Sequence, residues 1–260
     1  MKFDILKMNN FESLEDCQKR NSIILKAIQE KSNLENIKHK IESCSEFNRC
    51  QHILCSCCKR EFRCQYVPLI CNFASAMKHN YNLYAVTLLE PLDFHSTKHI
   101  DVHKLKNTLF QRIKRLFGHN VIVIGGLDIA YNVDSESKWK PFFHPHWHLL
   151  FITKLDRAVV RENLKKYYVQ TDIIKRPVRT VRVRSLRKCV SYMFSPYFTK
   201  RVRFLNTQSK VRNPFYDSKE YRLNKKEIQK LASRIKNYNI KDMLFLYRCR
   251  FRSDNCLSMT

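Results

Sequence analysis

Apolar and polar positions in the middle of the chain follow two different periods. Short runs of apolar residues predict buried strands, and apolar residues three or four positions apart predict amphipathic helices. The segment 176–184 alternates valine with arginine, which predicts a strand with one basic side. The expected strands are 84–89, 121–131, 146–153 and 176–184, and the expected helices are 101–117, 156–168 and 186–194.

Up to residue 184 these elements follow one another as strand, helix, strand, strand, helix, strand. This is the order of a ferredoxin-like split βαβ unit, whose two central strands are antiparallel neighbours. Here the central strands are 121–131 and 146–153. We therefore expect an α+β protein with a ferredoxin-like core and an antiparallel sheet. The helix that follows ends at Ser195-Pro196, because proline disfavours helical geometry in the residue before it.

The flanking segments differ from this core in composition. Apolar residues are sparse among the charges of 11–42, which is expected to be helical, and 225–238 is expected to form a helix near the other end. Seven of the eleven cysteines lie between Cys44 and Cys71. We therefore divide the chain into a helical N-terminal segment (1–43), a cysteine-rich segment (44–80), a core (81–200) and a basic helical C-terminal extension (201–260).

Two histidines one residue apart open the third expected strand. Side chains alternate between the faces of a strand, so His146 and His148 point the same way while Trp147 faces the opposite side. Neutral imidazole is the commonest metal-ligating side chain, so the pair forms half of a metal site. A histidine cluster satisfied by the core, or a structural zinc site, is the plainer alternative.

An acidic residue from the neighbouring strand can complete this site. If 121–131 pairs with 146–153, Asp128 or Asp134 approaches the histidines. Asp128 shares its face with Gly126 and Ala130, whose small size leaves room for a ligand. We therefore expect a metal centre on one face of the sheet.

The charge of the chain predicts a polyanionic partner. Lysine and arginine number 49 against 23 acidic residues, a formal net charge of +26. Cationic side chains neutralise phosphates, and the interspersed aromatic rings can stack on unpaired bases. We therefore expect a nucleic acid as the partner. A role at a membrane surface is not expected, because no strongly amphipathic basic helix carries exposed Trp or Leu.

Hydropathy and cysteine usage indicate a cytoplasmic protein. No stretch approaches the roughly 18 apolar residues of a membrane-spanning helix. Residues 1–10 lack the apolar core of a secretory signal. Cysteines in a cytosolic chain are more readily thiols or metal ligands than disulfides.

The residues after the fourth expected strand supply a candidate nucleophile. A metal held by two histidines and a carboxylate keeps coordination positions open for a phosphodiester. Tyrosine can attack phosphorus and form a covalent phosphotyrosyl bond, which conserves the energy of a cut strand for later joining. Tyr192 and Tyr197 are placed to reach such a site. The alternative is that each packs on the sheet with its hydroxyl at the rim.

These residues resemble motifs of the HUH endonuclease superfamily, and within it the replication initiator (Rep) proteins of rolling-circle plasmids. The resemblance spans about residues 44–200. Residues 84–88 resemble the first motif, and 126–132 resemble the segment before the second, where the family usually has Glu in the place of Asp128. Residues 144–150 resemble the second motif, which binds a divalent metal. The resemblance implies Mg²⁺ or Mn²⁺ as the catalytic metal, with the candidate ligands His146, His148, Asp128 and His144.

The third motif of the family is a helix that carries the nucleophilic Tyr, followed three residues later by Lys. Residues 190–196 resemble it with Tyr192 as the nucleophile, but Ser195 stands where Lys is expected. Tyr197 and Lys200 have the Tyr-x-x-Lys spacing but follow a proline. We favour Tyr192 as the nucleophile, with Tyr197 as the alternative and Lys200 as the source of the missing charge.

The cysteine-rich segment resembles one that these initiators often carry upstream of the first motif. Zinc favours four soft ligands in a tetrahedron, which closely spaced cysteines can provide. Buried thiols without a metal are the alternative. The expected ligands of a structural Zn²⁺ are Cys44, Cys50, Cys55 and Cys58, with Cys57, Cys64, Cys71 and His52 as alternatives.

The resemblance implies a site-specific enzyme that nicks and joins single-stranded DNA to start rolling-circle replication. The nick would leave a 5′-phosphotyrosine on the protein and a free 3′-hydroxyl, and origin DNA, a host helicase and a polymerase would be its partners. A transposase or mobilisation relaxase of the same superfamily shares this chemistry. Ser195 stands in the place of the Lys of the third motif, so a non-catalytic, zinc-containing nucleic-acid-binding protein is an alternative from another class. A metallohydrolase with a water nucleophile is a third alternative.

Overall fold

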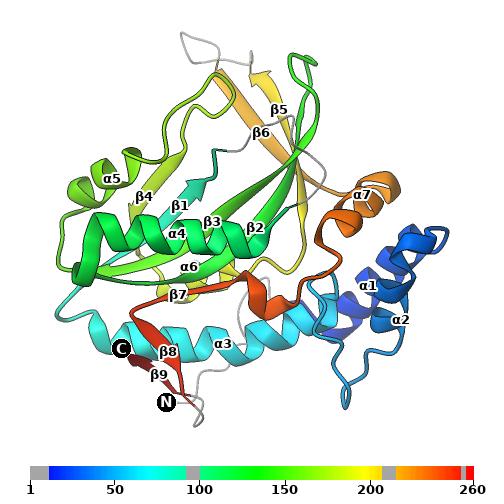
Figure 1. Cartoon of the computed structure of the whole chain (residues 1–260), viewed down its shortest axis with the longest axis horizontal. Coiled ribbons are helices and arrows are strands. Elements are labelled where there is room, and N and C mark those ends of the chain that lie inside the picture. Colours follow the sequence, from blue (N-terminus) through cyan, green and yellow to red (C-terminus); the bar gives the residue numbers. More distant parts are fainter. Residues whose placement is uncertain (1–11, 92–99, 207–214, 253–255) are drawn as a thin grey trace.

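The computed structural model describes residues 12–91, 100–206, 215–252 and 256–260 (Figure 1). Three short 3₁₀ turns connect longer elements at Ser32–Leu34, Gly118–Asn120 and Ile240–Met243. The helices are α1 (Leu14–Ile28), α2 (Glu35–Glu42), α3 (Ser56–Met77), α4 (Val102–Phe117), α5 (Arg157–Lys165), α6 (Leu186–Met193) and α7 (Lys225–Ile235). The strands are β1 (Asn82–Leu89), β2 (Val121–Asp134), β3 (Phe142–Thr153), β4 (Val178–Arg182), β5 (Thr199–Asn206), β6 (Phe215–Arg222), β7 (Leu244–Tyr247), β8 (Cys249–Phe251) and β9 (Leu257–Met259).

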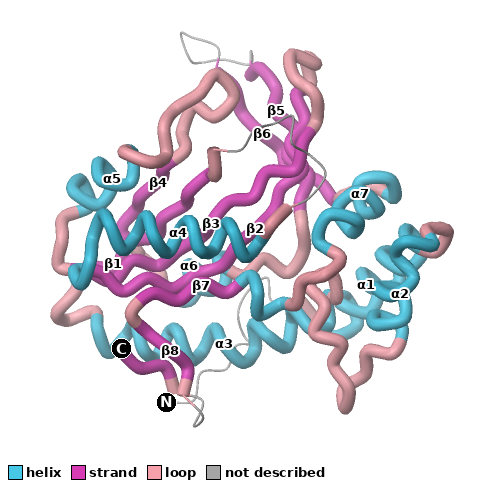
Figure 2. The backbone as a smooth tube through the Cα atoms, viewed as in Figure 1, coloured by secondary structure: helices cyan, strands magenta, loops and turns pink. Residues whose placement is uncertain are grey.

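A mixed, curled sheet forms the centre of this α+β protein (Figure 2). Its strands lie in the order β4-β1-β3-β2-β5-β6, and β7 pairs with the same edge of β2 as β5 does. The expected antiparallel pairing of 121–131 with 146–153 is confirmed by β2 and β3. We expected an antiparallel sheet. The sheet is instead mixed, because β5 runs parallel to β2.

Two apolar cores lie on opposite faces of the sheet. On β3, Trp147 and Phe151 join the core formed with α4 and α5, whereas Leu150 and Ile152 join the core formed with α3 and α6. Figure 1 shows α4 crossing one face of the sheet. Because side chains alternate along a strand, the even-numbered residues of β3 face α3 and α6. His146 and His148 therefore lie on the face covered by these two helices.

The C-terminal part of the chain differs from the expected helical extension. Its predicted helix is confirmed as α7, but most of its other described residues are in strands. The apolar run Leu244–Tyr247 pairs with the edge of β2 at Val123 to Gly126. That edge is otherwise unpaired there, and an exposed strand edge readily recruits another strand. Strands β5, β6 and β7 thus extend the central sheet.

The N-terminal part is helical as expected. A capping box between Ser13 and Asp16 begins α1, because the serine hydroxyl and the aspartate side chain satisfy the first free N–H groups of the helix. The cysteine-rich segment continues into the long helix α3, which the cysteine pattern did not predict. Over the described residues, no helix is both long and apolar enough to cross a membrane.

Candidate metal centres and tyrosine groove

The expected carboxylate and two histidines come together on the sheet. Asp128 on β2 lies directly opposite His146 on β3, and Gly126 lies opposite His148. One ligand atom of each of Asp128, His146 and His148 lies within 4.8 Å of the others, and all three residues are buried. The Asp128 Oδ2 atom is 3.5 Å from Nε2 of His146. These three residues form a group that can hold a metal ion.

Hydrogen bonds fix the orientation of both imidazole rings. The Nδ1 atom of His146 donates to the carbonyl oxygen of His144 at 3.2 Å, so its Nε2 atom carries the lone pair. This Nε2 atom is buried and has no hydrogen-bond partner among the described residues. Nδ1 of His148 forms a hydrogen bond with the hydroxyl of Thr87 at 3.3 Å. Metal-ligating histidines commonly use their second nitrogen in this way.

The ionisation of the three side chains suits a divalent cation. Burial lowers the pKa of His146 to about 3 and that of His148 to about 4, so both rings are neutral at neutral pH. Burial alone raises the pKa of Asp128, but the adjacent histidines and Lys59 outweigh it and hold that pKa below its ordinary value. One carboxylate and two neutral imidazoles are then ready to bind a metal without first losing protons.

The other expected ligands lie outside this group. Nε2 of His144 is hydrogen-bonded to the carbonyl oxygen of Glu90 at 2.8 Å, so the structure does not bring this histidine into the metal group. Asp134, the other acidic candidate on β2, pairs with Arg203 at 3.1 Å. The Glu90 carboxylate also accepts a hydrogen bond from Trp147 at 3.0 Å, which holds the histidine strand from its opposite face.

The four expected cysteines form a second group. The Sγ atoms of Cys44, Cys50, Cys55 and Cys58 all lie within 4.8 Å of one another. Three of the distances between them are 3.6 Å. A disulfide bond would need about 2.05 Å. Thiolates bound at about 2.3 Å around a tetrahedral zinc ion would be about 3.7 Å apart. The cluster can therefore hold zinc.

The alternative zinc ligands lie outside the cluster. His52 has both ring nitrogens occupied, since Nε2 lies 3.1 Å from the carbonyl oxygen of Lys236 and Nδ1 accepts from the N–H of Leu54. Burial raises the pKa of Cys71 to about 11, which favours an uncharged thiol. Cys57 and Cys64 are free thiols outside the four-cysteine group.

Tyr192 lies beside the histidines. Its ring on α6 packs edge-on against the ring of His148, with centroids 4.7 Å apart. It is nevertheless 59% exposed, so its hydroxyl group is accessible. Tyr192 lines a groove of about 860 Å³ together with Thr87, His148 and Arg179. An aromatic hydroxyl and a candidate metal centre thus border the same groove.

Tyr197 and Lys200 have partners outside the candidate metal group. Tyr197 is stacked beneath the guanidinium group of Arg20, 4.8 Å from its ring centroid. Lys200 lies opposite Tyr131 on β2. Asp128 is three residues before Tyr131 on the same strand, so the two side chains point to opposite faces of the sheet. The Lys200 ammonium group pairs with Glu227 on α7 at 2.8 Å. The structure therefore places the charge of Lys200 on a carboxylate and does not bring it to the groove at Tyr192.

Helix α3 brings two basic side chains to the same face, and neither was among the expected site residues. Lys59 is buried and lines a small gap together with Asp128 and Ser195. Arg63 donates a hydrogen bond to Ser191 at 2.8 Å, next to Tyr192 on α6. The signal available in the sequence was the position of Lys59 directly after Cys58. Its burial depends on how α3 packs, which the cysteine spacing does not reveal.

Comparison with protein-family models, curated proteins and solved structures finds no match to this chain. Its function is therefore inferred from the chemistry of its own sites, since a fold alone does not determine function.

Proposed function

We propose that this chain is a metal-dependent endonuclease and strand transferase that nicks and joins single-stranded DNA through a tyrosine. The observation that carries this proposal is the position of Tyr192. Its exposed ring contacts His148, whose neighbours Asp128 and His146 complete a buried group suited to a metal ion. A nucleophile beside a Lewis-acid site is the arrangement that phosphodiester transfer requires.

The arrangement of the strands supports the superfamily assignment. The order β4-β1-β3-β2, with antiparallel neighbours, matches a ferredoxin-like split βαβ unit. The two histidines lie on its central strand β3, as the HUH motif requires. We infer a protein of the HUH type, and a plasmid rolling-circle initiator within it. Residues 199–251 then add strands β5 to β7 to the edge of that unit and the β8 strand beyond it.

The chemistry follows from the residues that line the groove. A bound Mg²⁺ or Mn²⁺ ion would polarise the scissile phosphate as a Lewis acid, held by Asp128, His146 and His148. The Tyr192 oxygen forms the new bond to phosphorus and its proton passes to solvent, to which the side chain is open. The bond to the 3′ oxygen breaks, and this oxygen takes up a proton from water. The products are a free 3′-hydroxyl and a 5′-phosphotyrosine, and the reverse reaction joins strands.

The charge around Tyr192 supports a nucleic acid as the substrate. Arg179 and Lys188 line the groove beside this tyrosine. The formal net charge of +26 adds a general attraction for phosphates. We propose single-stranded origin DNA as the substrate, with a polymerase to extend the free 3′-hydroxyl and a helicase to open the duplex.

Covalent trapping tests the proposal directly. The protein is incubated with Mn²⁺ and a randomised single-stranded DNA library labelled at the 3′ end, and adducts that survive denaturing electrophoresis are collected. We expect a labelled adduct with the wild type that is lost in Tyr192→Phe and retained in Tyr197→Phe. Tyr221→Phe, a change at another exposed tyrosine, is the matched control.

The same experiment separates the alternatives. Cleavage without an adduct would indicate a metallohydrolase, and binding without cleavage would indicate a non-catalytic DNA-binding protein. An adduct retained when Tyr192 and Tyr197 are both replaced by phenylalanine would overturn the nucleophile assignment. A transposase or relaxase forms the same adduct, and the sequences recovered from it, compared with plasmid origins and transposon ends, distinguish these enzymes.

A further inference from the structure

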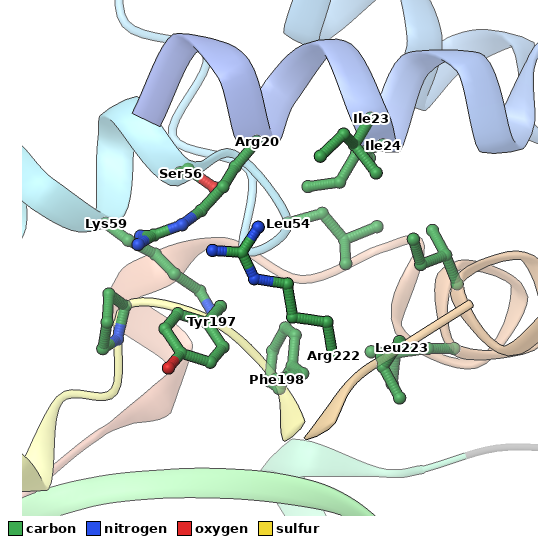
Figure 3. Close-up of a pocket in the computed structure, with 13 residues that line it drawn as sticks. Arg20, Ile23, Ile24, Leu54, Ser56, Lys59, Tyr197, Phe198, Arg222 and Leu223 are labelled. Carbon is green, nitrogen blue, oxygen red and sulfur yellow. The ribbon is translucent and has the colours of Figure 1, made fainter. Parts of the chain in front are cut away.

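A cavity between α1, the segment after α6 and α7 is lined by two arginines and by apolar side chains (Figure 3). Its volume is about 620 Å³ and it opens to solvent. Ile23, Ile24 and Leu54 form part of the apolar wall. Arg20 from α1 and Arg222 from the end of β6 both point into it (Figure 3). The cavity therefore combines an apolar wall with two guanidinium groups.

The two arginines favour the binding of an anionic ligand. Nη1 of Arg20 is buried and has no hydrogen-bond partner among the residues that the structure describes. Arg222 is exposed, and no hydrogen bond or ion pair joins it to any described residue. Buried guanidinium N–H groups are costly to leave unsatisfied, and the planar group matches a phosphate well. The apolar wall beside them suits a flat, uncharged ring.

The cavity shares lining residues with a hollow that borders Tyr192. Tyr192 also lines a second hollow of about 1820 Å³, together with Arg20, Tyr197 and the ion pair of Arg63 with Glu12. Arg20 and Tyr197 also line the cavity itself. Cations and aromatic rings therefore follow one path from the histidines to the apolar wall. Proteins that bind single strands combine these two kinds of side chain in the same way.

We propose that this cavity binds one nucleotide of a single strand that lies in the tyrosine groove. The base enters the apolar part beside Ile23 and Leu54, and its phosphate pairs with Arg20 and Arg222. Guanidinium planes and aromatic rings both serve as stacking surfaces for unpaired bases. The proposal rests on the proposed function for the identity of the ligand. It adds a site that holds a base outside the chemical step.

Base-dependent affinity, measured without added divalent metal, tests the proposal apart from any nicking. The probes are oligo-dT, oligo-dC and oligo-dA, each compared with an abasic chain of the same length and charge. Ile23→Trp fills the cavity from an exposed position, and Arg222→Ala removes an exposed cation. The matched controls are Val159→Trp and Arg157→Ala on α5, which covers the opposite face of the sheet.

We expect Ile23→Trp to weaken binding of at least one base-bearing probe by about fivefold or more, the loss of one stacked base. Its binding of the abasic chain changes little. Arg222→Ala weakens the binding of both kinds of probe, and the two α5 controls bind like the wild type. The site is overturned if Ile23→Trp binds every base-bearing probe like the wild type, or loses the same factor for the abasic chain.

The two proposals fail in different ways. Selective loss in Ile23→Trp together with no covalent adduct in the wild type would remove the nicking function and leave the base site. Adduct formation in the wild type with unchanged binding by Ile23→Trp would remove the base site and leave the nicking function. Thermal unfolding of each variant shows whether it retains the fold.

Discussion

Cys58 and Lys59 are consecutive residues of α3 that belong to two different sites. The Cys58 sulfur lies 3.6 Å from those of Cys44 and Cys50. The Lys59 ammonium group lies 3.5 Å from the ring centroid of Phe198 and lines the gap that contains Asp128. Neighbouring residues of a helix point about 100° apart, so one turn of α3 can contribute a side chain to each of the two sites. The first turn of α3 thus connects the cysteine cluster to the sheet.

Replacing Cys58 with serine is expected to remove zinc and destabilise the protein. A hard hydroxyl oxygen is a poor substitute for a thiolate, and the folding free energy that zinc binding supplies is lost with the ion. We expect bound zinc to fall from one equivalent to none and the melting temperature to drop. Cys57→Ser, at the neighbouring position outside the cluster, keeps its zinc. Equal zinc content in the two variants would contradict the assignment.

Replacing Lys59 with methionine is expected to have opposite effects on the two kinds of ligand. The Lys59 charge acts on Asp128, and a buried cation opposes the arrival of a metal ion there. Lys59→Met should therefore bind Mn²⁺ more tightly and single-stranded DNA more weakly. Titration calorimetry measures the first and fluorescence anisotropy the second. Lys188→Met, at an exposed position in the groove, should weaken DNA binding alone, and the same pattern in Lys59→Met would refute the prediction.

The strand pattern predicted the three candidate metal ligands, because the pairing of two strands is enough to bring them together. Once β2 and β3 are antiparallel, the alternation of side chains places Asp128 on the face of His146 and His148. Local spacing likewise predicted the four cysteines, because they lie within one short stretch. Both predictions required only contacts between two neighbouring strands or between residues close in the sequence.

Contacts that depend on helix packing could not be predicted from the sequence. In a chain of +26 charge, Lys59 looks like any solvated lysine, and its burial depends on where α3 meets the sheet. Lys200 was expected to supply charge to the tyrosine, but its strand pairs with β2 so that it meets Glu227 instead. The spacing of Tyr-x-x-Lys carries no information about that partner.

Stability should fall with acid because His146 and His148, the two candidate metal ligands, are buried as neutral groups. Their pKa is about 3 for His146 and about 4 for His148, against 6.5 for the exposed side chain. Between about pH 6.5 and pH 4 the unfolded chain takes up protons that the folded protein does not. The free energy of unfolding then falls by up to about 1.4 kcal/mol per pH unit for each histidine, in protein free of Mg²⁺ and Mn²⁺.

The double variant His146→Gln and His148→Gln removes both of these titrating groups and should reduce this acid dependence in urea unfolding. His79→Gln changes an exposed histidine that forms no ion pair with any described residue, and it is the matched control. The same slope in the wild type and the double variant would show that these histidines do not stay neutral in the fold.

Gly126 should be intolerant of alanine because α6 packs directly against it. A Cβ atom at this position would lie 2.6 Å from the backbone oxygen of Met193 and 3.1 Å from a ring carbon of Phe194. The small residue expected to leave room for a ligand therefore leaves room for the end of the tyrosine helix. Gly126→Ala must displace that helix, and with it Tyr192, from His148. We expect a loss of about 1–3 kcal/mol in stability and weaker adduct formation.

Gly118→Ala separates these two effects. Gly118 has a φ of +51° and no atom within 4 Å of an added Cβ, so alanine there strains the backbone without meeting a neighbour. It should lower the free energy of unfolding by a similar amount, since it forces a β-carbon into the left-handed region. Because Gly118 lies at the far end of α4, outside the groove lining, adduct formation should persist. If both variants lose the adduct in proportion to their stability, close packing at Gly126 has no specific role in placing Tyr192.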